Sequence, residues 1–135
     1  MESIFTKIIN REIPAYIIDE TTDYIAFLDV FPLSKGHVLV VPKKQVNYIF
    51  EMEDNSFIGL HLFSKRIAIA MQKAVQCERI GTAVIGLEVP HTHIHLVPIN
   101  NVGDINFSKP KLKLSEEDFL KIQKKIISKL ETKAI

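Results

Sequence analysis

The amino-acid sequence predicts an α+β domain in which a mainly antiparallel five-stranded sheet forms one layer and helices cover one face of it. Two observations support this fold class. Short β-branched runs, each bounded by Pro, Gly or polar residues, recur through the first hundred residues as a meander. Two longer segments, 57–76 and 116–131, carry apolar residues at helical spacing. Together, the strand-like runs and the helix-like segments predict a sheet layer and a helix layer that share one core.

Local signals place each predicted element. Ser3 can cap a short helix over residues 4–10, and Ser115, followed by three acidic residues, can cap the last helix. Pro90 and Pro98 bracket the final strand, because proline lacks an N–H and is tolerated at the ends of strands. The predicted strands, in chain order, are residues 15–19, 24–28, 37–41, 82–85 and 91–97.

Length and composition describe an ordinary globular protein. The 135 residues are 47% hydrophobic and 24% charged, which predicts a single domain, 1–135, with its own core. The net charge of +1 gives no global field that would attract nucleic acid or a membrane surface. Cys77 is the only cysteine, so an internal disulfide is excluded. Without a signal-like or membrane-length apolar run, we expect a cytoplasmic protein.

The most informative stretch runs from His91 to Pro98. His91, His93 and His95 alternate along a predicted strand, and successive strand side chains point to opposite faces, so the three imidazoles share one face. Ile94 takes the opposite face, which suits a core. Burying an imidazole is costly unless its nitrogens form hydrogen bonds. The row is therefore expected to face a cleft while its back anchors the fold.

Three interpretations of this row compete. It can be a set of surface histidines on a half-exposed strand. It can be a metal site, because His-x-His on a strand chelates zinc when a third ligand comes from elsewhere. The sequence has neither a cysteine pair nor a His-Glu-x-x-His helix, so we predict no metal. The third interpretation, which we favour, is phosphorus chemistry with imidazole as nucleophile near neutral pH.

The row also resembles the signature of the histidine triad (HIT) family, His-φ-His-φ-His-φ-φ, in which φ is apolar and Thr92 is the one imperfect match. Segments 3–14, 26–30 and 36–43 resemble further family blocks in the family's order. This resemblance implies a two-layer half-barrel. It also implies a twofold homodimer in which the sheet continues from one protomer into the other.

The resemblance further implies an enzyme of the phosphoramidase-like branch. Such members attack the α-phosphorus of a nucleoside phosphate derivative and form a covalent nucleotidyl-histidine intermediate that water opens. We therefore expect a hydrolase of nucleoside phosphoramidates or related nucleotidyl adducts, with a purine nucleotide as ligand and no cofactor. The alternatives are a dinucleoside polyphosphate hydrolase, a nucleotidyl transferase, and a non-catalytic nucleotide-binding or scaffold protein.

Catalytic roles carry over from the family to matching positions of this sequence. His93 would be the nucleophile, and a hydrogen bond to the carbonyl of His91 would hold the proton on its other nitrogen. His95 would donate a hydrogen bond to the phosphate and oppose its growing negative charge. His91 and His37 would orient the row and pass protons.

Substrate-binding roles carry over in the same way. Asp29 would accept hydrogen bonds from the ribose hydroxyls, although a turn residue at a strand end is the alternative. Val30, together with Phe5 and Ile25, would sandwich the base. Three lysines in the loop of residues 100–113 could steer an anion, but a solvated linker is the default interpretation.

One segment departs from the family pattern. Many members carry Gly-Gln-Ser/Thr-Val-x-His before the row, whereas this chain has a carboxyl, Glu88, where the hydroxyl is usual. An ionised carboxyl 4 Å from a phosphate charge costs about 4 kcal/mol at an effective dielectric of 20. Glu88 therefore points away, carries a proton, or faces a cationic leaving group; an exposed loop acid is an equally open interpretation.

Overall fold

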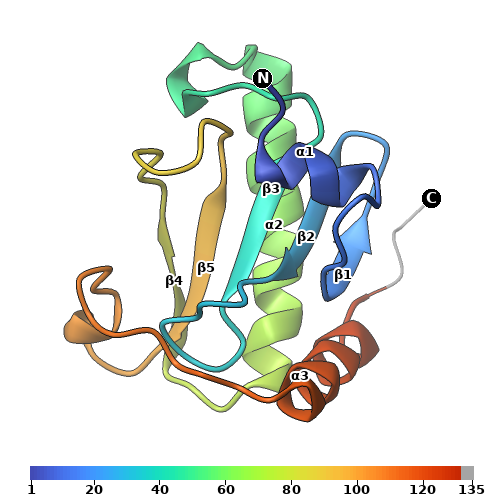
Figure 1. Cartoon of the computed structure of the whole chain (residues 1–135). Coiled ribbons are helices and arrows are strands. Elements are labelled where there is room, and N and C mark those ends of the chain that lie inside the picture. Colours follow the sequence, from blue (N-terminus) through green and yellow to red (C-terminus); the bar gives the residue numbers. More distant parts are fainter. Residues whose placement is uncertain (132–135) are drawn as a thin grey trace.

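The structure is a computed structural model that describes residues 1–131. It contains a five-stranded sheet in the order β1-β2-β3-β5-β4, and all neighbouring strands are antiparallel (Figure 1). The strands are β1 (Ile17–Glu20), β2 (Tyr24–Leu28), β3 (Val38–Pro42), β4 (Arg79–Ala83) and β5 (Ile94–Ile99). The predicted α+β fold is confirmed.

Residues 1–131 also contain three α-helices: α1 (Ile4–Ile9), α2 (Asp54–Ala74) and α3 (Glu116–Ser128). Short 3-10 turns follow β3 at Ile49–Glu51 and β5 at Val102–Asp104. The two longer helices pack on one face of the sheet, as predicted, whereas the short α1 lies against the other face (Figure 1). Within the described residues, no helix has both the length and the apolar character needed to cross a membrane.

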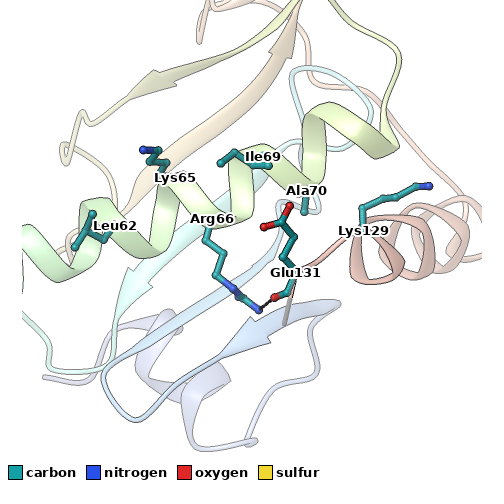
Figure 2. Close-up of a pocket in the computed structure, with 7 residues that line it drawn as sticks. All are labelled: Leu62, Lys65, Arg66, Ile69, Ala70, Lys129 and Glu131. Atoms are coloured by element: carbon teal, nitrogen blue, oxygen red, sulfur yellow. Dashed lines mark hydrogen bonds between the residues drawn. The ribbon is translucent and has the colours of Figure 1, made fainter. Parts of the chain in front are cut away.

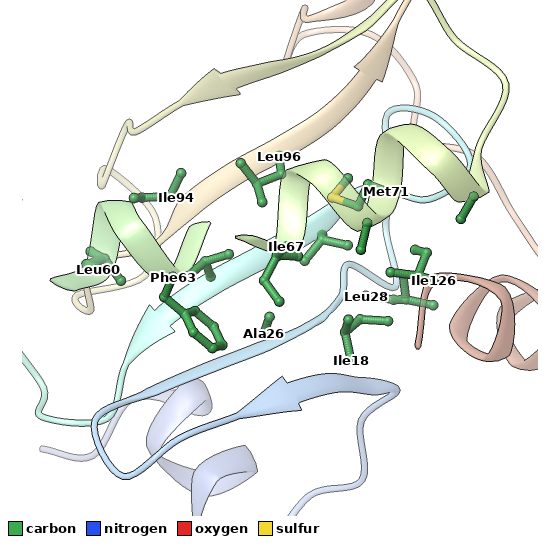
Figure 3. Close-up of a cluster of buried hydrophobic side chains, with 14 of the residues drawn as sticks. Ile18, Ala26, Leu28, Leu60, Phe63, Ile67, Met71, Ile94, Leu96 and Ile126 are labelled. Atoms are coloured by element: carbon green, nitrogen blue, oxygen red, sulfur yellow. The ribbon is translucent and has the colours of Figure 1, made fainter. Parts of the chain in front are cut away.

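The core separates into two layers because strand side chains alternate between the faces of the sheet. The face toward α2 buries a large cluster, drawn in Figure 3, that includes Ala26, Leu28, Ile94, Leu96, Leu60, Phe63, Ile67 and Met71. The α2 members recur at the spacings that predicted a buried stripe. A smaller cluster on the other face packs under α1 and consists of Phe5, Ile8, Ile25, Phe27, Leu39 and Val41.

Several element boundaries differ from the predictions, and the difference at β5 affects the site. The regular strand begins at Ile94 rather than at His91. The preceding residues pair with the loop after β3 instead, because the N–H and the hydroxyl of Thr92 both donate to the carbonyl oxygen of Val46, at 2.7 and 2.8 Å. The row of histidines therefore starts in a bent segment and ends in a strand.

The other boundary differences are small. The fourth strand begins three residues before the predicted Thr82, and α2 begins at Asp54 rather than at residue 57. The last helix ends at Ser128 instead of residue 131, while its predicted cap is present, since the Ser115 side chain accepts from the Asp118 N–H. The predicted single domain runs to residue 135, and residues 132–135 lie outside the described part of the chain.

Candidate active site

The antiparallel register of the sheet gathers three polar side chains at one end of the face that α1 partly covers. Leu28 of β2 pairs with Val38 of β3, so the next residues outward, Asp29 and His37, are opposed, and the Asp29 N–H donates to the His37 carbonyl at 2.9 Å. Gly36 precedes His37 with φ +89, in the left-handed region that favours glycine. On the other side of β3, His95 of β5 pairs with Leu39.

His91 is fully buried and held from two sides. Its Nε2 lies 2.7 Å from the Pro42 carbonyl oxygen, which can only accept, so this nitrogen carries the proton. Its Nδ1 lies 2.6 Å from the Ser3 hydroxyl, which then donates to it. Burial lowers the pKa of His91, in agreement with the neutral form. Ser3 also accepts from the Thr6 N–H as the cap of α1, so this helix end is joined to the histidine row.

His93 has the tautomer that a nucleophile needs. Its Nδ1 lies 2.8 Å from the His91 carbonyl oxygen and must donate to it, which leaves Nε2 without a proton in the neutral ring. Burial lowers the pKa of His93, and the negative charge of Glu88 acts against that shift. The Phe5 ring packs edge-on against the imidazole, with ring centroids 5.0 Å apart. The hydrogen bond predicted for this histidine is therefore present.

His37 and His95 form a directed hydrogen-bond chain. The Leu33 N–H donates to His37 Nδ1 at 3.0 Å, so the proton of the neutral His37 ring is on Nε2. That nitrogen lies 3.0 Å from His95 Nδ1, which must accept, and the His95 proton is therefore on Nε2. Burial, reinforced by neighbouring positive charge, lowers the pKa of His37 to about 3 and that of His95 to about 4. Both rings are neutral at pH 7.

Asp29 lies beside this chain. Its Oδ1 accepts from the Phe31 N–H at 2.8 Å, and its Oδ2 lies 3.6 Å from His37 Nε2. Burial raises the pKa of Asp29, although the Phe31 N–H and the charge of Lys111 oppose the shift. Asp29, His37 and His95 offer ligand atoms within 4.8 Å of one another, so these three residues could hold a metal ion. The predicted absence of metal stays a prediction.

The residues predicted to contact a base differ in their exposure and in their distance from the histidines. Val30 is 47% exposed beside Asp29, and Phe5 lies over the histidines. Ile25 is 0% exposed and pairs with Val41 inside the sheet, so it offers no surface to a base, and the predicted role for it is corrected. Phe27, on the same face but nearer to Asp29, packs against Phe5 with ring centroids 5.6 Å apart.

Two features of the site were missed by the sequence analysis. The first is the segment 106–112, hereafter the strap, whose Phe107 ring packs against His95 with centroids 4.7 Å apart. The second is the support of His91 by Ser3, which the sequence identified only as a helix cap. The basic loop gave a weak signal for the strap, because Phe107 is an aromatic residue in an otherwise polar segment.

A separate groove lies on the outer side of α2, away from the histidines (Figure 2). Its Arg66 forms an ion pair with Asp19 and donates to the Glu131 carbonyl oxygen at 3.1 Å, which joins the helix to β1 and to the end of the described chain. Among the described residues, its lining contains neither histidine nor cysteine, and consists of Leu62, Lys65, Arg66, Ile69, Ala70, Lys129 and Glu131. These contacts suit a structural role.

The antiparallel sheet and the alternating histidines, with their fixed tautomers, define a histidine-triad protein. Residues 10–102 match the HIT domain family, and the chain belongs to this family. It is 32% identical over 133 residues to an uncharacterized HIT-like protein of Borreliella burgdorferi, covering 93% of this chain and 96% of the relative. It is 31% identical over 133 residues to an adenosine 5'-monophosphoramidase of Schizosaccharomyces pombe, covering 96% and 99%.

Solved structures agree with this assignment. The crystal structure of a HIT-like protein involved in cell-cycle regulation from Bartonella henselae superposes with a TM-score of 0.83. The two chains are 29% identical, and the match covers 96% of each. The fold predicted from the resemblance is thus shared over nearly the whole described chain.

Proposed function

We propose that the protein hydrolyses nucleoside phosphoramidates, or related nucleotidyl adducts, at the α-phosphate. The observation that carries the proposal is the 2.8 Å hydrogen bond from His93 Nδ1 to the His91 carbonyl, which makes Nε2 an unprotonated nucleophile. The phosphoramidase from Schizosaccharomyces pombe, which is similar over nearly its whole length, supports the choice of substrate class.

The geometry suggests how the residues would share the reaction. His93 Nε2 would attack the α-phosphorus, so that an N–P bond forms as the bond to the leaving amine breaks. The leaving nitrogen would take a proton from solvent and depart as an amine, while the Nε2–H of His95, oriented by the 3.0 Å hydrogen bond from His37, would donate to a phosphate oxygen. Water would then attack the phosphorus of nucleotidyl-His93, the N–P bond would break to restore the neutral imidazole, and the proton of water would pass to the released amine or to solvent, which releases the nucleoside monophosphate.

The surroundings of Asp29 suit the rest of a nucleotide. Its carboxyl is 17% exposed at the edge of the histidine row, where ribose hydroxyls could donate to it. Val30, which is 47% exposed, offers apolar surface for a purine next to that position, and the buried rings of Phe5 and Phe27 pack against each other beside it.

We also propose that the protein forms a homodimer in solution. The fourth strand is an edge of the sheet, with one side of its backbone unpaired by any strand among the described residues. Exposed apolar side chains lie on α2 and in the loop that follows this strand, including Ile58, Leu62, Ile85 and Leu87. An exposed strand edge with apolar neighbours suits a self-complementary twofold interface.

Turnover of a fluorogenic adenosine phosphoramidate, measured beside turnover of a diadenosine polyphosphate, tests the proposed activity. His93→Ala should lower kcat for the phosphoramidate by about 1000-fold or more, because no other group replaces the nucleophile. His61→Ala is the matched control, since His61 is an exposed histidine of α2 whose side chain, within residues 1–131, forms a hydrogen bond only with the Phe57 carbonyl. A His93→Ala variant with near-normal kcat would contradict the proposal, and faster polyphosphate turnover by the wild type would change the substrate class.

A further inference from the structure

The histidine site has an unbalanced charge. The hydrogen-bond pattern makes His37 and His95 neutral, because each accepts a hydrogen bond at Nδ1. His91 and His93 each place one nitrogen against a carbonyl oxygen, and both are buried in their neutral forms. The carboxyl groups near these histidines, Asp29 and Glu88, can add negative charge but no positive charge. A nucleotide substrate brings a further negative charge on its phosphate, so the site needs a cation to bind it.

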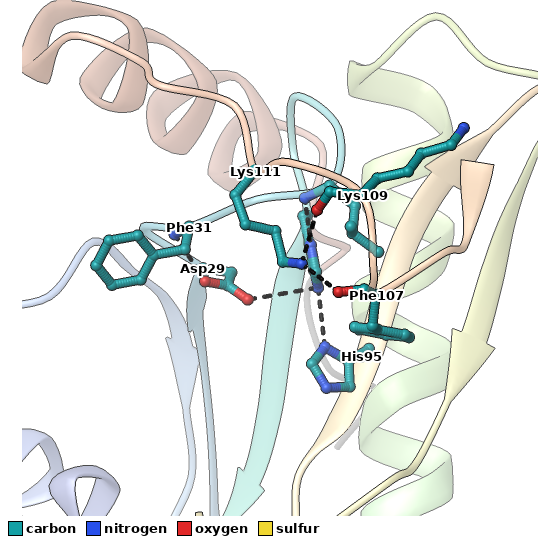
Figure 4. Close-up of polar contacts among 8 residues, drawn as sticks. Asp29, Phe31, His95, Phe107, Lys109 and Lys111 are labelled. Atoms are coloured by element: carbon teal, nitrogen blue, oxygen red, sulfur yellow. Dashed lines mark hydrogen bonds and ion pairs between the residues drawn. The ribbon is translucent and has the colours of Figure 1, made fainter. Parts of the chain in front are cut away.

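The strap supplies one cation at the right place. In Figure 4 the Lys111 side chain extends from the strap toward Asp29 and His95. Its positive charge acts on Asp29, His37 and His95, which places the ammonium within electrostatic reach of all three. Of these three groups, His95 is the one that the proposed function places at the reacting phosphate, so the ammonium lies near the expected phosphate position.

Lys111 is held in place without being neutralised. Its Nζ donates to the carbonyl oxygens of Phe107 and Lys109, at 2.7 and 3.1 Å. These bonds account for two of the three ammonium hydrogens, and within residues 1–131 no carboxylate lies within the 4.0 Å salt-bridge distance of Lys111. One donor and the full positive charge therefore remain for a ligand.

The strap that carries Lys111 is itself fixed to the body of the protein. The Leu112 N–H donates to the Pro32 carbonyl oxygen at 2.9 Å, and Pro32 belongs to the loop between β2 and β3 that ends at His37. The ring of Phe107 packs on His95. Because both ends of this short segment are attached, little side-chain freedom is lost when an anion binds.

We propose that Lys111 forms the anion subsite of this histidine site and binds the phosphate of a nucleotide. This inference rests on the proposed function and deepens it, because the neutral histidines supply the nucleophile and hydrogen-bond donors while Lys111 supplies the charge. The subsite would favour a nucleoside monophosphate over the corresponding uncharged nucleoside.

A purely structural role for Lys111 would have different consequences. If the lysine only fastened the strap, its loss would weaken the binding of every ligand that touches the site, charged or not. Comparing AMP with adenosine separates the two roles, because the ligands differ only in the phosphate. Lys109 provides a matched control: it belongs to the same strap, and its charge acts on Asp104, away from the histidines.

The test is calorimetric titration of AMP and of adenosine into the wild type, Lys111→Met, Lys111→Arg and Lys109→Met. Lys111→Met should weaken AMP binding by about tenfold or more and change adenosine binding by less than about twofold. Lys111→Arg should restore most of the AMP affinity, and Lys109→Met should match the wild type. Added salt should weaken AMP binding less in Lys111→Met than in the wild type.

Each result has a defined meaning. Unchanged AMP affinity in Lys111→Met would overturn the inference, and so would an equal loss for AMP and adenosine. A wild type that binds neither ligand would instead overturn the proposed function. The two failures are therefore distinguishable within one set of titrations.

Discussion

The two ends of the histidine row are built differently. At the first end, His91 is 0% exposed, and both of its ring nitrogens contact fixed partners: the Pro42 carbonyl and the Ser3 hydroxyl that caps α1. At the other end, His95 contacts His37, which titrates, and the Phe107 ring of a surface strap. The first end is held by a backbone carbonyl and a helix-capping hydroxyl, whereas the second end contacts one titratable group, His37, and one aromatic ring.

This difference separates two tasks within one short segment. The first end holds the His91 carbonyl in place, and this carbonyl sets the tautomer of His93. The contribution of the first end is therefore geometric. In the proposed reaction, the second end would set the charge and the proton positions near the phosphate, so its contribution would be electrostatic. Substitutions at the two ends should therefore change different measured quantities.

The largest effect should be the acid sensitivity of the His37–His95 end. Their folded pKa values, about 3 and 4, lie below the ordinary histidine value of 6.5, so the unfolded chain binds more protons between these limits. The free energy of unfolding should therefore fall as the pH drops from 6.5 toward 4, by about 1.4 kcal/mol per pH unit for each ring. Urea unfolding at pH 7, 6 and 5 measures this slope.

Two variants sharpen that measurement. His37→Gln should reduce the slope, whereas His61→Ala should keep it, because His61 is exposed on α2. Stability that is constant between pH 7 and 5 would show that the buried rings are not held neutral.

The next effect concerns the first end of the row. Ser3→Ala should lower kcat by about 10-fold or more, because His91 loses the donor that fixes its ring, and should cost about 1 kcal/mol of stability as a lost helix cap. Ser115→Ala is the matched control, since Ser115 caps α3 in the same way and lies outside the site. If both variants lose stability equally and keep full kcat, Ser3 acts only as a cap.

A smaller effect is expected at Glu88, which is exposed and whose charge reaches His93 and Asp29. An anion there should favour cationic leaving groups and repel extra phosphates. Glu88→Ser should raise kcat/KM for diadenosine polyphosphate relative to a lysyl phosphoramidate by about tenfold. The ratio is measured for both proteins at low salt, and an unchanged ratio would place Glu88 among the ordinary exposed loop acids.

The smallest effect should be that of chelation. The proposed reaction uses imidazole as nucleophile and hydrogen-bond donor, so exhaustive dialysis against a chelator should leave kcat unchanged. Metal analysis of the same sample provides the comparison. Stoichiometric zinc, together with activity that chelation removes and zinc restores, would instead assign Asp29, His37 and His95 as metal ligands.

The sequence predicted the parts of this arrangement that depend on local pattern. Alternation placed Ile94 in the core, and helical spacing identified the buried stripe of α2. The family resemblance supplied the bond between His93 and the His91 carbonyl, which joins residues two apart. These features require only a periodic pattern or a short motif.

The remaining features depend on contacts between distant segments. The bond between Ser3 and His91 spans 88 residues, and local periodicity contains no information about such a contact. The strap reaches the site because the Leu112 N–H donates to the Pro32 carbonyl, which is a contact between distant segments. The polar composition of the strap does not reveal this contact and, by itself, indicated a linker. The burial of Ile25 follows from the position of α1 over the sheet, which the pattern of one strand could not predict.

The central claim is that His93 becomes covalently nucleotidylated, and trapping the intermediate tests it most directly. Enzyme and adenosine phosphoramidate would be mixed at comparable concentrations and quenched in alkaline denaturant within the first turnover, because the N–P bond of a phosphohistidine is acid-labile. Peptide mass spectrometry should then find an adenylyl group on His93, and none in His93→Ala. Product formation without any adduct, or an adduct on His95 instead, would contradict the account.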